Sequence, residues 1–330
     1  MLVLDAVTVE KLLPMDACID AMEHALVALA QKASISPLRT VIRLPKGAIA
    51  AMPAYDDASA TAGAKVVTAF PGNPALGLAS HLGVVLLFDA TDGVLRAVLD
   101  ASAITAIRTA AVSGLATRVL AREDATVLAI IGTGVQARAH VESILAVRPI
   151  ATIRVASRDT GRATAFVADL TDRYDCEFVV SASVQAAVRH ADVVCTVSNS
   201  RTPILMGAWL APGTHVNAVG SSVKDARELD ASAVAMSRLY CDARQSILAE
   251  SGDFLIAKAE GAVDDSHVIG ELGEVLTGAV GGRTSAEQVT LFKSLGLGIE
   301  DLSAANYVYA RAVDQGVGIQ VPFAGQERHS

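Results

Sequence analysis

The chain has 330 residues, a formal net charge of −8 at pH 7 and a hydrophobic fraction of 52%. This length is enough for two domains with a well-buried core. The net charge is negative and the basic residues are not clustered, which argues against a nucleic-acid partner and favours a small molecule. The sequence shows neither an apolar run of membrane-spanning length nor an N-terminal export signal, so we expect a cytoplasmic protein without membrane partners.

Neither the cysteines nor the histidines are spaced like a metal site. The four cysteines lie far apart without a Cys-x-x-Cys pair, as expected for reduced core thiols in the cytoplasm. The histidines show no His-Glu-x-x-His pattern and no clustered carboxylates, so we expect no bound metal.

The N-terminal third of the sequence predicts helical structure followed by several short strands. Residues 8–32 carry apolar positions at helical spacing, with Pro14 near the start of the main helix. Strands are expected at 38–43, 48–52, 63–69, 83–89 and 94–99. The last two flank Ala-Thr-Asp-Gly at 90–93, which predicts a hairpin. An alanine-rich stretch at 101–121 then predicts a long helix.

From residue 127 onward strands and helices alternate, which is typical of a doubly wound parallel sheet. We expect strands at 127–131, 152–157, 177–180, 192–197, 214–219 and 238–241, and helices at 135–146, 161–172 and 184–190. Two further helices are predicted at 285–296 and 299–316, the second returning to pack on the first domain. The tail at 326–330 is expected to be disordered.

Residues 127–137 (VLAIIGTGVQA) have the pattern of a dinucleotide-binding loop. An apolar strand leads into Gly132, which permits a sharp turn, and Gly134 leaves room for a pyrophosphate to approach the backbone. The helix that follows turns its positive end toward the phosphates, so Val135 and Gln136 are expected to lie along them.

A second cofactor signal stands at the end of the next predicted strand. Ser157 occupies the position where NAD enzymes usually carry an acid, and Arg158 follows it, which suits the 2′-phosphate of NADPH. In the alternative, Arg158 is a solvated loop charge and Asp159 faces the ribose of NADH. We expect NADPH to be preferred, with NADH possible.

Three cationic residues of the N-terminal region are candidates for binding an anion. Lys65 and Arg108 each lie among apolar or small neighbours, and Arg39 lies in the predicted strand at 38–43. A buried charge is costly unless it is paired, so each cation needs a partner. An anionic substrate is one such partner, and protein carboxylates or solvent are the alternatives.

Several motifs in order along the chain resemble the ornithine cyclodeaminase/mu-crystallin family. They are MPAYDD (52–57), GAKVV (63–67), ITAIRTAAVSGLAT (104–117), GTGVQA (132–137), NAVGSS (217–222), ELGEV (271–275) and FKSLGLGIED (292–301). The resemblance implies an α/β fold whose N-terminal α/β domain (1–118, joined by 303–330) binds substrate and forms the interface of a homodimer or larger assembly. It also implies a Rossmann NAD(P)-binding domain at 119–302.

The same resemblance assigns roles to individual residues. Arg39, Lys65 and Arg108 fall on positions that hold the substrate carboxylate and reacting nitrogen beside the nicotinamide, although Arg43 lies close to Arg39 in the same predicted strand. Cofactor contacts are implied for Ser80, His81, Arg108, Val219 and Ser294. Glu271 is expected to face the substrate, with a helix-start carboxylate as the alternative.

Ser222 distinguishes between the activities of the family. Cyclodeaminases carry an aspartate in the segment that matches NAVGSS, and a serine cannot replace it as an unaided general base. Asp225 lies three residues away from that position. The serine resembles the branch that reduces cyclic imines, such as Δ1-pyrroline-2-carboxylate and Δ1-piperideine-2-carboxylate, to L-proline and L-pipecolate.

In this hypothesis Arg108 and Arg39 fix the carboxylate, and Lys65, its pKa lowered by burial and neighbouring arginines, delivers a proton to the imine nitrogen. Alternatives are an alanine dehydrogenase-like enzyme, an ornithine cyclodeaminase, or a non-catalytic NADPH-dependent ligand-binding protein. A structure in which Lys65 and Arg108 point away from the nicotinamide ring, toward bulk water or internal acids, would overturn the hypothesis.

Overall fold

The computed structural model describes residues 1–323, which divide into two units. Unit 1 contains Met1–Arg108 together with the chain from Leu297 onward, and unit 2 is Thr109–Gly296. The boundaries expected from the sequence were 118/119 and 302/303. They differ because helix α3 (Ala101–Leu120) runs through the first boundary and α11 (Gly298–Gln315) belongs wholly to unit 1. The predicted tail at 326–330 lies outside the described residues.

Unit 1 is built on a mixed sheet in the order β16-β1-β7-β6-β5-β4-β2, with β3 paired to β4. The strands are β1 (Leu2–Leu4), β2 (Ser34–Ile35), β3 (Thr40–Leu44), β4 (Gly47–Asp56), β5 (Thr61–Ala69), β6 (His81–Asp89), β7 (Leu95–Asp100) and β16 (Ile319–Gln320). Neighbours are antiparallel except β1 and β7. The predicted hairpin joins β6 to β7, where Asp89 N donates to Val94 O at 3.0 Å and Gly93 has a positive φ.

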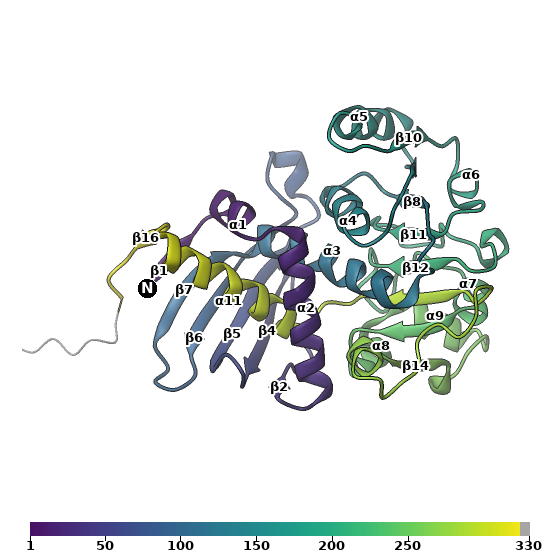
Figure 1. Cartoon of the computed structure of the whole chain (residues 1–330). Helices are drawn as coiled ribbons and strands as arrows, with labels where there is room; N and C mark the ends of the chain where they lie inside the picture. The colour runs from purple at the N-terminus through teal and green to yellow at the C-terminus, as the bar shows by residue number, and fades with distance from the viewer. Residues whose placement is uncertain (324–330) are drawn as a thin grey trace, which may run out of the picture. The chain divides into compact units, whose positions relative to one another are not determined.

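Two long helices cover one face of this sheet, α2 (Met15–Ala30) and α11, as Figure 1 shows. Apolar side chains of α2 such as Ile19, Met22 and Leu26 are buried there. The helical stretch expected over 8–32 is two helices, because Pro14 adopts an extended conformation between α1 (Ala6–Leu12) and α2.

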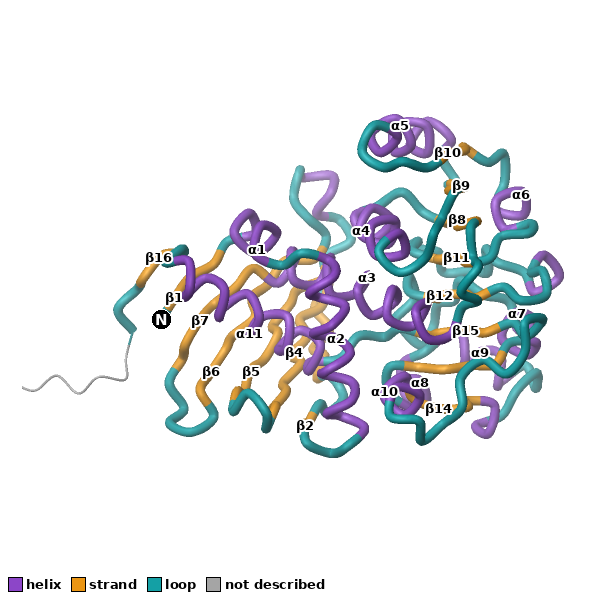
Figure 2. Tube along the Cα trace, viewed as in Figure 1, coloured by secondary structure: helices purple, strands orange, loops and turns teal. Residues whose placement is uncertain are grey.

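Unit 2 is a parallel sheet in the order β10-β9-β8-β11-β12-β15-β13-β14 (Figure 2). Its strands are β8 (Val127–Ile131), β9 (Thr152–Ala156), β10 (Glu177–Val180), β11 (Val193–Thr196), β12 (His215–Ala218), β13 (Arg238–Cys241), β14 (Val268–Glu271) and β15 (Thr290–Lys293). Its helices, besides the end of α3, are α4 (Val135–Leu145), α5 (Thr160–Thr171), α6 (Val184–Val188), α7 (Ala231–Met236), α8 (Arg244–Glu250), α9 (Gly252–Ala259) and α10 (Leu272–Leu276). The strand order reverses between β8 and β11, as in Rossmann folds, which confirms the predicted fold class.

The prediction of a helix at 285–296 was wrong, because this segment contains strand β15. All four residues of β15 are buried between β12 and β13. A short apolar run that is buried on both faces has no strict alternation, so its periodicity does not distinguish a strand from a helix.

Helix α3 is long and apolar enough to span a membrane, but 72% of its most apolar window is buried inside this structure. Its last carbonyl groups are capped by the buried Arg148, whose Nη2 donates to Thr117 O at 2.8 Å and Ala121 O at 3.1 Å. These contacts are those of a core helix.

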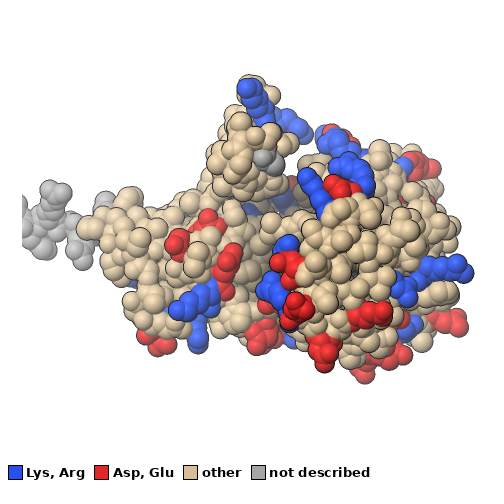
Figure 3. All heavy atoms as spheres, turned by 90° about the horizontal axis from the view of Figure 1, so that it is seen from above, with Lys and Arg blue, Asp and Glu red and all other residues tan. Residues whose placement is uncertain are grey.

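Acidic and basic side chains are intermixed on the face drawn in Figure 3.

Candidate active site

Four buried charged residues from three elements of unit 1 form one cluster. Lys65 lies on β5 and Arg108 on α3, with 3% and 4% of their surface exposed. Glu300 and Asp301 stand in the first turn of α11 and are fully buried. We call these four residues the buried charge cluster.

Asp301 joins the two cations of this cluster. Its Oδ1 accepts hydrogen bonds from Lys65 Nζ and Arg108 Nε, both at 2.9 Å, and its Oδ2 lies 2.8 Å from Lys65 Nζ. Arg108 Nη1 also donates to Glu300 Oε2 at 2.7 Å, and Lys65 Nζ donates to Thr105 Oγ1 at 3.3 Å. Both cations therefore have internal acids as partners, which is the outcome that would count against the hypothesis. The burial of Lys65 and Arg108 alone gives no argument for an anionic substrate.

The electrostatic surroundings of Lys65 suit proton transfer near neutral pH. Burial lowers the pKa of Lys65 to about 8; Asp301 opposes this shift, while the charges of Arg108 and Arg39 add to it. An amine with this pKa is mostly protonated at pH 7 and still gives up its proton readily. Arg39 is half-buried and its charge reaches Lys65, whereas Arg43 is exposed on β3.

Ser80 and His81 stand at the start of β6, the strand paired with β5. Ser80 Oγ lies 3.0 Å from His81 Nδ1, and the backbone of His81 is in register with Ala69. Desolvation and then the charge of Lys65 lower the pKa of His81. His81 is therefore close enough to Lys65 to sense its charge and is expected to be neutral at pH 7.

In unit 2 the predicted nucleotide loop follows β8, at the point where the strand order reverses. Gly132 has a φ of +128°, and a Cβ there would lie 2.7 Å from the carbonyl oxygen of Val197, which follows β11. Gly134 precedes α4 without a side-chain cap, and a Cβ there would meet no atom within 4 Å. The open backbone at Gly134 and the uncapped helix end fit a dinucleotide pyrophosphate. Val135, the first residue of α4, is 69% exposed.

The end of β9 presents Ser157 and Arg158 much as the sequence predicts. Ser157 Oγ accepts from Asp159 N at 3.3 Å, and Arg158 is exposed. Asp159 instead caps α5, because its Oδ1 accepts from Arg162 N at 3.1 Å. The Asp159 carboxylate therefore has a partner at the start of α5.

The segment after β12 carries Val219 and Ser222. Val219 N donates to Thr196 O at 3.0 Å, and Ser222 is exposed. Asp225 forms a surface ion pair with Arg201 at 2.6 Å, so its carboxylate has another partner.

Ser294, which follows β15, is buried, and its N–H donates to Ala218 O at 3.1 Å. The backbone beyond it is held by Asp242, whose Oδ2 accepts from Leu295 N at 2.5 Å and Gly296 N at 2.6 Å. Asp242 therefore orders the chain next to the residue expected to touch the nicotinamide.

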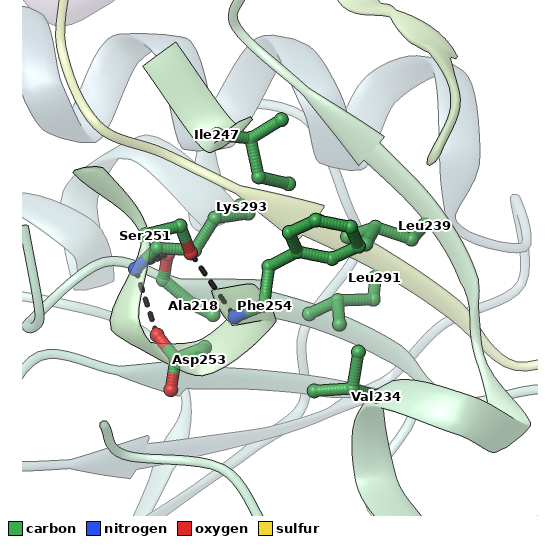
Figure 4. A pocket seen from close by; sticks show the side chains of 9 residues that line it. All are labelled: Ala218, Val234, Leu239, Ile247, Ser251, Asp253, Phe254, Leu291 and Lys293. Carbon is green, nitrogen blue, oxygen red and sulfur yellow. Dashed lines mark hydrogen bonds and ion pairs between the residues drawn. The ribbon is translucent and has the colours of Figure 1, made fainter. Parts of the chain in front are cut away.

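Lys293 was not among the predicted site residues, yet it supports the segment after β12 from inside the core (Figure 4). Its Nζ donates to Ser221 O at 2.5 Å and Ala218 O at 3.2 Å, and pairs with Asp253 at 3.0 Å. The space drawn in Figure 4 has no room for a water-sized molecule, so Lys293 has a structural role there.

Glu271, which was expected to face the substrate, stands at the start of α10. Its Oε1 accepts from Arg244 N at 2.7 Å, and it forms a capping box with Glu274. These contacts are those of a helix-start carboxylate, the alternative weighed from the sequence.

All four cysteines are free thiols, and three of them, Cys18, Cys195 and Cys241, are buried. Among residues 1–323 no group of three or more acidic, histidine or cysteine side chains is arranged to hold a metal ion.

Comparison with known proteins supports the motif-based resemblance. The model of the ornithine cyclodeaminase/mu-crystallin family matches residues 1–316. The ketimine reductase mu-crystallin of Mus musculus is 41% identical over 277 residues, which cover 83% of this chain and 84% of that protein. The structure of Thermococcus litoralis Delta(1)-pyrroline-2-carboxylate reductase in complex with NADH and L-proline is 37% identical, with a TM-score of 0.95 over 97% of this chain and 100% of that one. An archaeal alanine dehydrogenase dimer with bound NAD is 32% identical, with a TM-score of 0.94 over 98% and 99% of the two chains.

Proposed function

The chain belongs to the ornithine cyclodeaminase/mu-crystallin family, and we propose that it is an NAD(P)H-dependent reductase of cyclic imino acids. Its substrates are Δ1-pyrroline-2-carboxylate or Δ1-piperideine-2-carboxylate, and its products are L-proline or L-pipecolate. The observation that carries this proposal is the nearly full-length likeness to a reductase whose structure holds NADH and L-proline. The lowered pKa of Lys65 adds a proton donor suited to imine chemistry.

In the proposed reaction, the nicotinamide of the bound nucleotide supplies a hydride to the imine carbon. Lys65 supplies the proton that the ring nitrogen gains, so the C=N bond becomes a CH–NH bond and Lys65 is left neutral. Arg108 and Arg39 orient the carboxylate, which selects the face of the ring that is reduced. The ion pairs of Lys65 and Arg108 with Asp301 hold both side chains in place before substrate binds.

The cofactor proposed is NADPH, with NADH as a possible second donor. The choice of NADPH is supported by Ser157 and Arg158 at the end of β9. A 2′-phosphate bound there would interact with a serine hydroxyl and a guanidinium, whereas NAD enzymes usually carry an acid at this position. Gly132, Gly134, Val135 and Gln136 are proposed to hold the pyrophosphate.

An alanine dehydrogenase-like reaction is the second candidate, since the archaeal alanine dehydrogenase covers the chain almost as fully. Ornithine cyclodeamination is disfavoured because the exposed Ser222 cannot act as a general base and Asp225 pairs with Arg201. A ligand-binding protein without catalysis does not require the lowered pKa of Lys65.

The test is a substrate panel followed by NADPH absorbance. Purified protein is given Δ1-pyrroline-2-carboxylate, Δ1-piperideine-2-carboxylate, pyruvate with ammonium, and no substrate. We expect oxidation of NADPH with the cyclic imines and formation of the L-amino acid. Turnover confined to pyruvate with ammonium would establish the alanine dehydrogenase alternative, and binding of NADPH without any turnover would favour a ligand-binding protein.

We further propose that the enzyme is a homodimer in the cytoplasm. Strand β3 exposes Val41, Ile42 and Leu44, which gives unit 1 an apolar edge suited to a second copy. Four free thiols fit a reducing compartment. Light scattering coupled to size-exclusion chromatography tests the dimer; a mass of one chain at micromolar concentration would exclude it.

A further inference from the structure

Asp301 of the buried charge cluster contacts both Lys65 and Arg108 through hydrogen bonds of 2.9 Å each. We infer that Asp301 is a positioning residue that keeps Lys65 protonated and aligned for proton transfer. This inference rests on the proposed function, because it assigns Asp301 its role through Lys65 as the proton donor.

The start of α11, which carries Asp301, packs closely on two other segments. Gly298 packs so closely on β4 that a Cβ would lie 2.6 Å from Pro53 O and 2.8 Å from Met52 O. Ile299 N donates to Ser36 Oγ at 3.3 Å, which fixes the same turn from a third segment. Asp301 thus lies in the first helical turn, where the helix dipole stabilises a negative charge.

Both acids of the cluster contact Arg108, and Asp301 also contacts Lys65. Asp301 contacts Lys65 through both carboxylate oxygens, at 2.9 and 2.8 Å, and its charge raises the pKa of Lys65 against the effect of burial. Glu300 contacts the Nη1 atom of Arg108 at 2.7 Å. Each substitution removes one carboxylate partner of Arg108, so an effect found in Asp301→Asn and not in Glu300→Gln reports on the contact with Lys65.

Replacing Asp301 with a neutral residue should change the pKa of Lys65, the proposed proton donor. Lys65 would then be buried beside the positive charge of Arg108 without its opposing carboxylate, so its pKa would fall further. Reduction requires protonated Lys65, and the activity therefore declines as pH rises through this pKa. The declining limb of the pH profile should move to lower pH in Asp301→Asn and stay in place in Glu300→Gln.

The experiment compares the wild type, Asp301→Asn and the matched control Glu300→Gln. The pH dependence of kcat is measured with Δ1-pyrroline-2-carboxylate and saturating NADPH. In parallel, trace acetylation of Lys65 is followed against pH by peptide mass spectrometry in the protein without nucleotide. We expect both midpoints to fall by about one pH unit or more in Asp301→Asn, with kcat at pH 8 at least about fivefold lower.

Equal midpoints in Asp301→Asn and the wild type, or equal displacements in Asp301→Asn and Glu300→Gln, would overturn the inference. If Asp301→Asn does not fold, Asp301→Glu retains the charge and should lower kcat without moving either midpoint; a displaced midpoint there would also contradict it. If the wild type reduces no imine, the proposed function fails, and the acetylation midpoints still decide whether Asp301 controls the protonation of Lys65.

Discussion

His140 Nε2 lies 2.9 Å from Ser113 Oγ, so a fully buried imidazole ties α4 to α3. The other ring nitrogen, Nδ1, lies 2.7 Å from Gln136 O in the first turn of α4. The start of the helix expected to face the pyrophosphate is therefore anchored to the core through one neutral histidine. A buried imidazole that is neutral in the folded state makes the stability of the fold decrease at acidic pH.

We predict that unit 2 loses stability as the pH falls from 6.5 toward 4. Burial lowers the pKa of His140 to about 4 and that of His215 to about 3, whereas an unfolded histidine titrates near 6.5. Below pH 6.5 the unfolded chain therefore binds protons that the folded chain excludes, and each histidine costs about 2 kcal/mol of stability at pH 5. Urea unfolding at pH 7 and pH 5 measures the difference.

The variant His140→Gln should weaken this pH dependence, while His24→Gln, a change at an exposed position of α2, should leave it unaltered. An identical loss of stability between pH 7 and pH 5 in His140→Gln and the wild type would show that His140 does not contribute.

Periodicity was sufficient to predict the strands and helices from β8 to β12, because turn residues separate them at regular intervals. Strands β8 and β10 begin and end at the predicted residues, 127–131 and 177–180. It failed at β15, where burial on both faces removes the alternation that marks a strand. Periodicity also gave no prediction for α7 to α10, because each of these helices is too short to show a helical period.

In the site, residue type predicted the cations, but neither spacing nor residue type predicted their acids. Lys65 and Asp301 are 236 positions apart, so no local spacing connects them. Two adjacent acids at the start of an amphipathic helix are usually explained by the helix dipole, and only the fold shows that Glu300 and Asp301 point into the core. Their presence within the motif FKSLGLGIED was the one available signal.

Replacing Lys65 with alanine should lower kcat for imine reduction by about a hundredfold or more, because the proposed proton donor is lost. Binding of NADPH, measured by its fluorescence, should be retained. The control Lys46→Ala alters an exposed lysine beyond β3 and should behave as wild type. Near-normal turnover of a folded Lys65→Ala protein would rule out the assigned role.

Replacing Arg158 with alanine should lower kcat/KM for NADPH by about tenfold or more and leave that for NADH unchanged. The reason is that an exposed guanidinium next to Ser157 is proposed to pair with the 2′-phosphate, a group that NADH lacks. Arg162→Ala is the matched control, since Arg162 is also exposed and lies one turn further along, beside Asp159. A wild-type protein that already prefers NADH would refute the NADPH assignment.

The two glycines of the nucleotide loop should respond differently to an added methyl group. At Gly132 the φ of +128° is unfavourable for alanine and the new Cβ would lie 2.7 Å from Val197 O, so Gly132→Ala should lose about 2 kcal/mol of stability or more. At Gly134 the backbone is extended and the space around a Cβ is open, so Gly134→Ala should unfold at the wild-type urea concentration. If a pyrophosphate approaches this backbone, the same methyl group must weaken NADPH binding, by about tenfold. Fluorescence titration measures that affinity, and wild-type binding by a stable Gly134→Ala protein would place the phosphates elsewhere.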